Sequence, residues 1–331
     1  MAAHQVVARE ARIGPWLVAA GAALWGTESA WRIPLNDRFP DADVLVFWEH
    51  VVLVLLALPM MLPRLRELRG ISRRALGWLV FSGIAGSAVG AVFFTLALKH
   101  GNPTVVNVVL NMQPVLSTTA ACLLFGDRLA RRFFVWAPIA VIAGMVLVGL
   151  ISPGFSFHVD TGIGYALICA LFWGLSTVAG RGVMVEMSLP LAAGLRVTIG
   201  LAAMAVIVAV RGLMHGASLW PPLASASSWS TAIYIGLLGA ASGWAPLLLY
   251  FKGLSLTRAS TAGYFEMLQT LAAVLITWGV FHEALSPLQV VAALALIGAV
   301  AMVQRAQEAT ALPPPSLDDA APPVPEARVV Q

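Results

Sequence analysis

Apolar stretches of about 20 residues recur along the whole chain, and they constrain its fold more than any other feature. A helix needs about 20 such residues to cross the roughly 30 Å hydrocarbon core of a bilayer. Transmembrane β-strands would instead be shorter segments of alternating polarity. Only 11% of the residues are charged, against about 25% in soluble domains. The chain is therefore predicted to be an all-α polytopic membrane protein with ten transmembrane helices, at 14–33, 44–62, 77–97, 103–125, 134–152, 161–180, 189–210, 230–250, 259–281 and 286–304.

The basic residues lie mostly on one side of these predicted helices. Most of the 20 Lys and Arg residues fall in every second link, including the arginine-rich link 64–74, or near the chain ends. By the positive-inside rule, these links and both termini are predicted to be cytoplasmic, in a bacterial cytoplasmic membrane. The formal net charge of +4 reflects this topology, and it indicates a lipid bilayer rather than nucleic acid as the partner.

The helices of the first half recur in the second half. Shifting the segment 103–129 by 156 positions places Gln113 on Gln269, and shifting the first helix by 148 positions places Trp25 on Trp173. Because each copy has an odd number of spans, the second copy enters the membrane from the opposite side, which makes an inverted repeat. The predicted organisation is a cytoplasmic N-terminus (1–13), a first five-helix repeat (14–152), a second (161–304) and a Pro- and Ala-rich tail expected to be disordered (305–331).

Polar side chains inside the apolar stretches mark candidate sites, because a charge at mid-membrane costs about 2.5–3.5 kcal/mol. Most of the acidic and asparagine candidates would lie in the outer half of the membrane, and Arg196 and Glu266 in the inner half. Two such clusters suit a cavity that opens alternately to each side. The substrate- or proton-site candidates are Glu28, Glu49, Asn107, Asn111, Gln113, Arg196, Glu266 and Gln269, and the aromatic candidates for a cavity wall are Trp25, Trp173 and Tyr264.

Each candidate also has a structural interpretation. Glu28 and Arg32 are four residues apart and could pair near the outer interface. Arg196 and Glu266 could form an ion pair between helices, and Glu49 could be hydrated close to the end of its helix. The amide candidates would then only join helices by hydrogen bonds, and the two tryptophans would only pack.

Enzyme signatures are absent from the sequence. There is no G-x-x-x-x-G-K-[ST] phosphate loop and no H-E-x-x-H zinc motif, and the six histidines are scattered. The two cysteines, Cys122 and Cys169, lie inside predicted helices and are expected to behave as small apolar residues. No enzyme activity, cofactor or metal is expected, so any pumping would draw on an ion or substrate gradient.

Over residues 14–304 the chain resembles the drug/metabolite transporter superfamily, and within it the EamA-type bacterial permeases. The shared features are the ten spans, the Trp-Gly element in helices one and six, and a mid-helix proline followed by Gly-Glu-Arg-Leu. Pro114 and Gly126-Asp127-Arg128-Leu129 match this last pattern, whereas the second half has Thr270 and Phe281-His282-Glu283-Ala284-Leu285. An arginine that is frequent in helix two of the family is replaced by Trp48-Glu49-His50, while Arg196 keeps its place in helix seven.

The resemblance implies a secondary transporter of small metabolites, amino acids or related solutes, which is frequently an exporter and often proton-linked. Under this hypothesis Glu28 or Glu49 on the outer side and Glu266 on the inner side exchange protons. Arg196 then holds a substrate carboxylate or neutralises Glu266. The alternatives are an uncoupled facilitator and a membrane scaffold or sensor that transports nothing. The oligomeric state is open, with a homodimer as one alternative.

Overall fold

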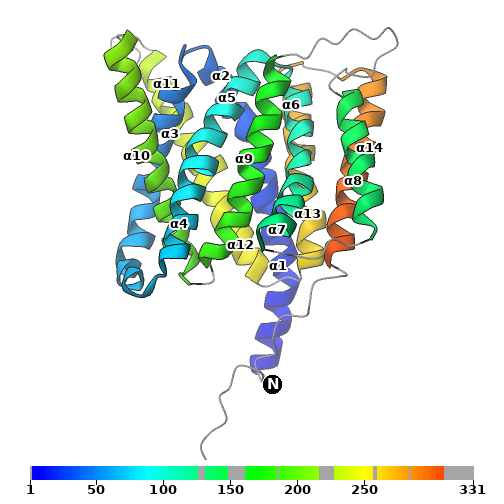
Figure 1. The fold of residues 1–331 in the computed structure, drawn as a ribbon, viewed down its shortest axis with the longest axis horizontal. Coiled ribbons are helices and arrows are strands. Elements are labelled where there is room, and N and C mark those ends of the chain that lie inside the picture. Colours follow the sequence, from blue (N-terminus) through cyan, green and yellow to red (C-terminus); the bar gives the residue numbers. More distant parts are fainter. Residues whose placement is uncertain are drawn as a thin grey trace, which may run out of the picture.

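The computed structural model describes residues 2–125, 131–147, 161–184, 186–215, 227–255, 259–282 and 285–308. Every regular element in these ranges is a helix, and the helices stand side by side as an upright bundle (Figure 1). Five of the uninterrupted helical stretches are long and apolar enough to cross a membrane, and three shorter apolar helices accompany them. The molecule is thus an all-helical, multi-pass membrane protein.

The first half of the chain forms five rods, three of which change helix type or direction along their length. They are α1 (Ala2–Gly26) with α2 (Glu28–Asn36), α3 (Ala42–Met61), α4 (Arg73–Phe81) with η2 (Ser82–Val89) and α5 (Gly90–His100), α6 (Pro103–Val109) with η3 (Leu110–Met112) and α7 (Gln113–Phe125), and α8 (Phe133–Leu147). A 3-10 helix, η1 (Leu62–Gly70), links the second rod to the third.

The second half repeats the plan with fewer interruptions. Its rods are α9 (Thr161–Met184), α10 (Leu189–His215), α11 (Ser227–Gly239) with η4 (Ala240–Trp244) and α12 (Ala245–Ser255), α13 (Ala259–Gly279) and α14 (Pro287–Glu308). Nine of the ten predicted apolar stretches coincide with these rods to within a few residues, and the first does not. That helix begins earlier, at Ala2, and turns at Thr27 before α2.

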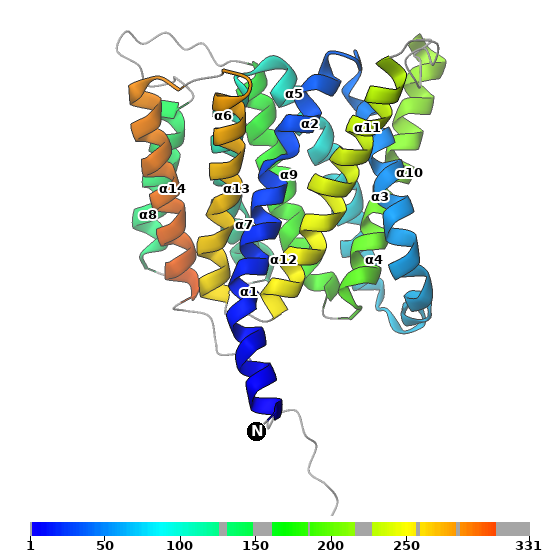
Figure 2. The same cartoon turned by 180° about the vertical axis from the view of Figure 1, so that it is seen from behind.

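The two halves pack as an inverted pair (Figure 2). Helix α1 packs against α12 and α13, and its counterpart α9 packs against the equivalent elements of the first half, α5 with η2 and α7. Two further close pairs, α3 with α10 and α8 with α14, each join equivalent helices. Because α1 and α9 run in opposite directions through the bundle, a two-fold axis in the membrane plane relates the halves.

Two π-helical segments occupy equivalent places in the third and eighth rods. Shifted by 156 positions, η4 falls inside η2. Both are built from small residues, Ser-Gly-Ile-Ala-Gly-Ser-Ala-Val and Ala-Ala-Ser-Gly-Trp. Glycine and serine weaken a regular α-helix, and π-segments often lie at functional sites.

A shorter 3-10 segment, η3, interrupts the fourth rod just before Pro114. A proline lacks the N–H that would close the preceding turn, which explains the local change of pitch. The acidic turn predicted after α7, at 126–129, lies outside the described residues, as do Glu283 and Ala284 of the turn after α13 and most of the C-terminal tail.

Candidate functional site

A cavity of about 410 Å³ lies at the centre of the bundle, between the two halves. At its deep end it contacts Arg32, and it continues to Met184 and Leu189 where α9 and α10 meet. Met184 is 41% exposed, so the cavity reaches the surface at this end of the bundle, called here the α1 end because α1 also starts there. The lining residues include Trp25, Glu28, Glu49, His50, Ser87, Gln113, Trp173, Arg196, Trp244, Tyr250 and Gln269.

The opposite end, called the α2 end, is closed by apolar packing. Leu35 of α2 and Phe39, which follows that helix, pack with Leu45, Leu238 and neighbouring buried side chains. Beyond this layer, Lys99 donates to the carbonyls of Phe39 and Pro40, and Arg211 pairs with Asp41 and Asp43. The cavity is therefore one-sided in this structure.

An ionic cluster forms the floor of the cavity. The Arg32 guanidinium donates through Nε to Glu28 at 3.0 Å, through one terminal nitrogen to Thr95 at 2.7 Å, and through the other to both oxygens of Glu49 at 2.8 and 2.9 Å. Its carbon also lies 5.4 Å from the ring centre of Phe94. Arg32 is completely buried. The predicted Glu28–Arg32 pair is confirmed, and it is enclosed by Glu49 and Thr95.

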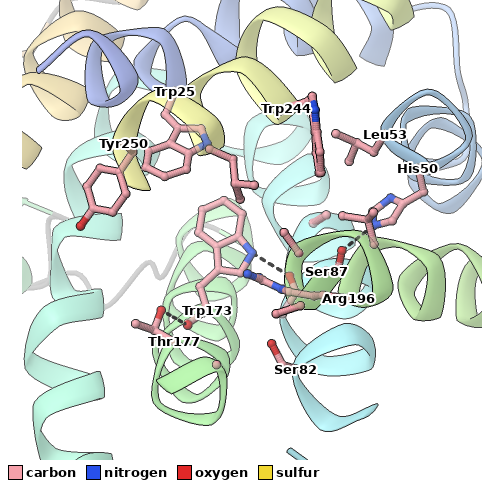
Figure 3. Close-up of a pocket in the computed structure, with 18 of the residues that line it drawn as sticks. Trp25, His50, Leu53, Ser82, Ser87, Trp173, Thr177, Arg196, Trp244 and Tyr250 are labelled. Carbon is pink, nitrogen blue, oxygen red and sulfur yellow. Dashed lines mark hydrogen bonds between the residues drawn. The ribbon is translucent and has the colours of Figure 1, made fainter. Parts of the chain in front are cut away.

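Arg196 extends into the cavity from α10 toward Trp173 (Figure 3). Its Nε is buried and has no hydrogen-bond partner among the described residues. A side chain at Gly86 would collide with it, since an ideal Cβ there would lie 2.9 Å from one terminal nitrogen of Arg196. The guanidinium thus lies close against η2, and its Nε donor has no acceptor among the described residues.

His50 and Ser87 are site residues that the sequence analysis did not select. His50 Nδ1 lies 2.8 Å from the carbonyl oxygen of Val46, which can only accept, so Nδ1 carries the proton. Its Nε2 lies 2.8 Å from the Ser87 hydroxyl. His50 follows the candidate Glu49 directly, and its neighbour Leu53 also lines the cavity, so a helical face drawn through these positions would have identified it. Within the described residues, no three His, Cys, Asp or Glu side chains gather as a metal site.

Two aromatic pairs each place a tryptophan on the lining of the cavity. Trp173 packs on Phe94 with ring centres 5.3 Å apart and planes at 49°. Trp25 packs on Tyr250 at 5.1 Å and 49°, and Tyr250 corresponds to Phe94 under the shift of 156 positions. The pairs are equivalent in the repeat, and both tryptophans line the cavity (Figure 3).

The two tryptophans differ in one hydrogen bond. The Trp173 indole N–H donates to the carbonyl of Gly86 in η2 at 3.0 Å. Gly86 corresponds to Ser242 in η4, but no such bond joins Trp25 to Ser242 in the described part of the chain. Two equivalent positions on the cavity lining therefore differ in this hydrogen bond, in a cavity that opens at one end.

The asparagine candidates lie outside the cavity lining and connect helices. Asn107 donates to Ser29 of α2 at 2.9 Å, and Asn111 accepts from Thr270 of α13 at 2.8 Å. Such interhelical bonds stabilise a bundle by about 0.6 kcal/mol each. The glutamine candidates do line the cavity, as an equivalent pair from α7 and α13, and Gln113 donates to Thr177 at 3.4 Å. The side chains of Glu266 and Tyr264 lie outside the described residues.

Comparison with known proteins adds three findings. The model of the EamA-like transporter family matches residues 12–150 and again residues 160–305. A curated relative, the riboflavin transporter ImpX of Fusobacterium nucleatum subsp. nucleatum, is 25% identical over 309 residues, which cover 88% of this chain and 97% of that protein. A solved crystal structure has a TM-score of 0.54 at 20% sequence identity, covering 88% of this chain and 96% of its own, and its likeness concerns the fold alone.

Proposed function

The chain belongs to the EamA-like transporter family, and we propose that it carries its small-molecule cargo by alternating access through the central cavity. The family and the curated relative support a membrane transporter of small metabolites, and they point to a transporter rather than an enzyme. The proposal concerns how the cavity works, in which direction cargo moves, what drives it and which cargo it takes.

The observation that carries alternating access is the unequal state of two equivalent tryptophans. Trp173 is bonded to Gly86 in η2, whereas Trp25 is not bonded to the equivalent carbonyl of Ser242 in η4. In inverted repeats, the opposite-facing state is reached when the two halves exchange conformations. In that state Trp25 would bond to Ser242 and Trp173 would release Gly86, so each bond stabilises one direction of opening.

The open end of the cavity supports one direction of transport for this proposal. The cavity reaches the surface at the α1 end, where the arginine-rich η1 also lies. If this end is cytoplasmic, as the distribution of basic residues favours, the structure is the state that loads cargo from the cytoplasm. Export across the cytoplasmic membrane is the direction that such a resting state supports.

Proton coupling is supported by the composition of the Arg32 cluster. Two carboxylates, Glu28 and Glu49, share one guanidinium, so the ionised cluster holds one excess negative charge in a buried place. A proton on either carboxylate would remove this charge and one ionic hydrogen bond, which loosens the floor that closes the α2 end. Glu266 remains the proposed proton site nearer the α1 end, and a homodimer remains the proposed assembly.

The aromatic walls support a cargo that contains a planar ring. Trp25, Trp173, Trp244 and Tyr250 all line the cavity, and its volume of about 410 Å³ is within the range of small-molecule sites. Riboflavin, named for the curated relative, is the first compound to test. Aromatic amino acids belong in the same panel, because the family resemblance implies amino-acid-like cargo.

The test is flux of riboflavin and aromatic amino acids in proteoliposomes, with and without a pH gradient. We expect gradient-driven accumulation of at least one compound, reduced about tenfold or more in Glu49→Gln and in Glu28→Gln. Asp37→Asn is the matched control, because Asp37 is an exposed carboxylate at the end of α2, outside the cavity lining. Flux that ignores the gradient would contradict coupling and leave a facilitator. No flux of any compound would favour the scaffold or sensor.

A further inference from the structure

We propose that the cavity binds the carboxylate of an aromatic solute on Arg196, so that the cargo class is a planar aromatic monoanion. The inference rests on the proposed function for the direction in which such a solute moves, but the binding site itself stands on the geometry of the cavity. It names the group that recognises the cargo and the charge that the cargo carries.

The two arginines of the cavity differ in what they already bind. All three nitrogens of the Arg32 guanidinium donate, to Glu28, Glu49 and Thr95. Arg196 has a buried Nε without an acceptor, and no carboxylate among the described side chains pairs with it. A buried donor without a partner is costly, and the cost is largest for a charged group. An anionic oxygen placed by the cargo would relieve it.

The guanidinium is fixed in a position that suits a ligand. The absence of a side chain at Gly86 lets Arg196 lie against η2, and the Trp173 indole beside it is held by its bond to the Gly86 carbonyl. A planar guanidinium binds a carboxylate through two parallel N–H donors. A ring attached to that carboxylate would extend toward the aromatic walls formed by Trp173 and the Trp25–Tyr250 pair (Figure 3).

The charges of the cavity favour one negative charge on the cargo over two. Among the described lining residues, the cations Arg32 and Arg196 are balanced by the carboxylates Glu28 and Glu49. A carboxylate adds a single negative charge, which one proton on the Arg32 cluster can offset. A phosphate monoester adds about 1.5 to 2 negative charges, and burying the second charge without a counterion is costly. The cavity therefore suits a carboxylate better than a phosphate.

Three probes with one ring system test the inference: indole-3-acetate, its neutral isostere indole-3-acetamide, and the cation tryptamine. Their binding to the purified full-length protein would be measured by calorimetry at one fixed pH. We expect the acetate to bind about tenfold more tightly than the amide, with tryptamine the weakest. Arg196→Gln should abolish the preference for the acetate, and Arg196→Lys should keep part of it because it retains charge without the planar fork.

Arg211→Gln is the matched control. Arg211 lies on the same helix but pairs with Asp41 and Asp43 at the α2 end, so its loss should leave the acetate preference unchanged. A thermal melt of each variant separates lost binding from lost folding, and if Arg196→Gln does not fold, Arg196→Lys alone decides. The inference is overturned if the wild type binds the amide as tightly as the acetate, or if the folded Arg196 variant tested keeps the full preference.

The outcomes also separate this inference from the proposed function. Gradient-driven flux of a neutral compound, with no preference for the acetate in binding, would overturn the cargo class and leave transport intact. Tight binding of the acetate that depends on Arg196, with no flux of any compound across liposomes, would support the binding site and contradict transport.

Discussion

At the residue scale, the Arg32 cluster shows how far spacing along one helix can predict a site. Glu28 and Arg32 are four residues apart, so their pairing follows from helix geometry alone. Glu49 lies 17 residues from Arg32 and Thr95 lies 63 away, and no local rule brings these together. Contacts with distant residues therefore make the Glu28–Arg32 pair part of the buried floor of the cavity.

Removing Arg32 alone should lower the free energy of unfolding more than neutralising the whole cluster does. Arg32→Met leaves Glu28 and Glu49 without a counterion, and breaking a buried ion pair in this way typically costs about 3–5 kcal/mol of unfolding free energy. The triple variant Arg32→Met, Glu28→Gln, Glu49→Gln removes the stranded charges and should regain most of that loss. Unfolding in detergent, followed by circular dichroism, measures both. A triple variant no more stable than Arg32→Met would show that the cluster is not held by charge pairing.

At the scale of elements, reciprocal contacts hold η1 and α4 to the junction of α9 and α10. Glu186 accepts from the backbone N–H and the hydroxyl of Ser72, each at 2.7 Å. Glu67 accepts from the N–H and the hydroxyl of Ser188 at 2.8 and 2.9 Å. Each carboxylate thus satisfies donors at or just before a helix N-terminus, where negative charge is favourable. These contacts hold α4, α9 and α10 together beside the opening of the cavity.

The Glu186 contact should make stability depend on pH. The backbone N–H of Ser72, and then its hydroxyl, hold the pKa of Glu186 below its ordinary value of 4.5. Because the folded pKa is the lower one, the stabilisation is complete above the ordinary value and is lost as pH falls through the folded pKa. In thermal melts run downward from about pH 6, Glu186→Gln should lose less stability than the wild type, while Asp37→Asn follows the wild type. Parallel profiles for Glu186→Gln and the wild type would contradict this.

At the scale of the whole molecule, the sequence predicts the architecture well and the cavity in part. Ten apolar stretches and two offsets predict the rods and their inverted relation, because helix length and span number are local properties. Which polar side chains contact one another, by contrast, depends on residues that are far apart in the sequence. Asn107 and Arg196 are both polar residues within predicted apolar helices, yet Asn107 bonds to Ser29 between helices and Arg196 enters the cavity. The way in which the helices pack separates these outcomes.

The π-segments are a further feature that the sequence does not reveal by periodicity. Gly86 of η2 lies close to Ser176 of α9 and to Arg196 of α10. At the equivalent positions η4 has Ser242 in place of Gly86 and the larger Trp244 in place of Ala88, so sequence likeness between the two segments is weak. The two segments are related by their π-helical backbone. In η2 this backbone presents the Gly86 carbonyl to Trp173.

Alternating access between the two tryptophan states is the central claim, and side-specific thiol labelling tests it most directly. Thr177 is exposed and lines the cavity, so Thr177→Cys, with Cys122 and Cys169 replaced by Ala, reports access in oriented vesicles. We expect a membrane-impermeant reagent to react from the α1 side. Trp173→Phe should slow this reaction and Trp25→Phe should speed it, each by up to about fivefold for one hydrogen bond. Equal reaction from both sides, or both substitutions acting in the same direction, would contradict the account.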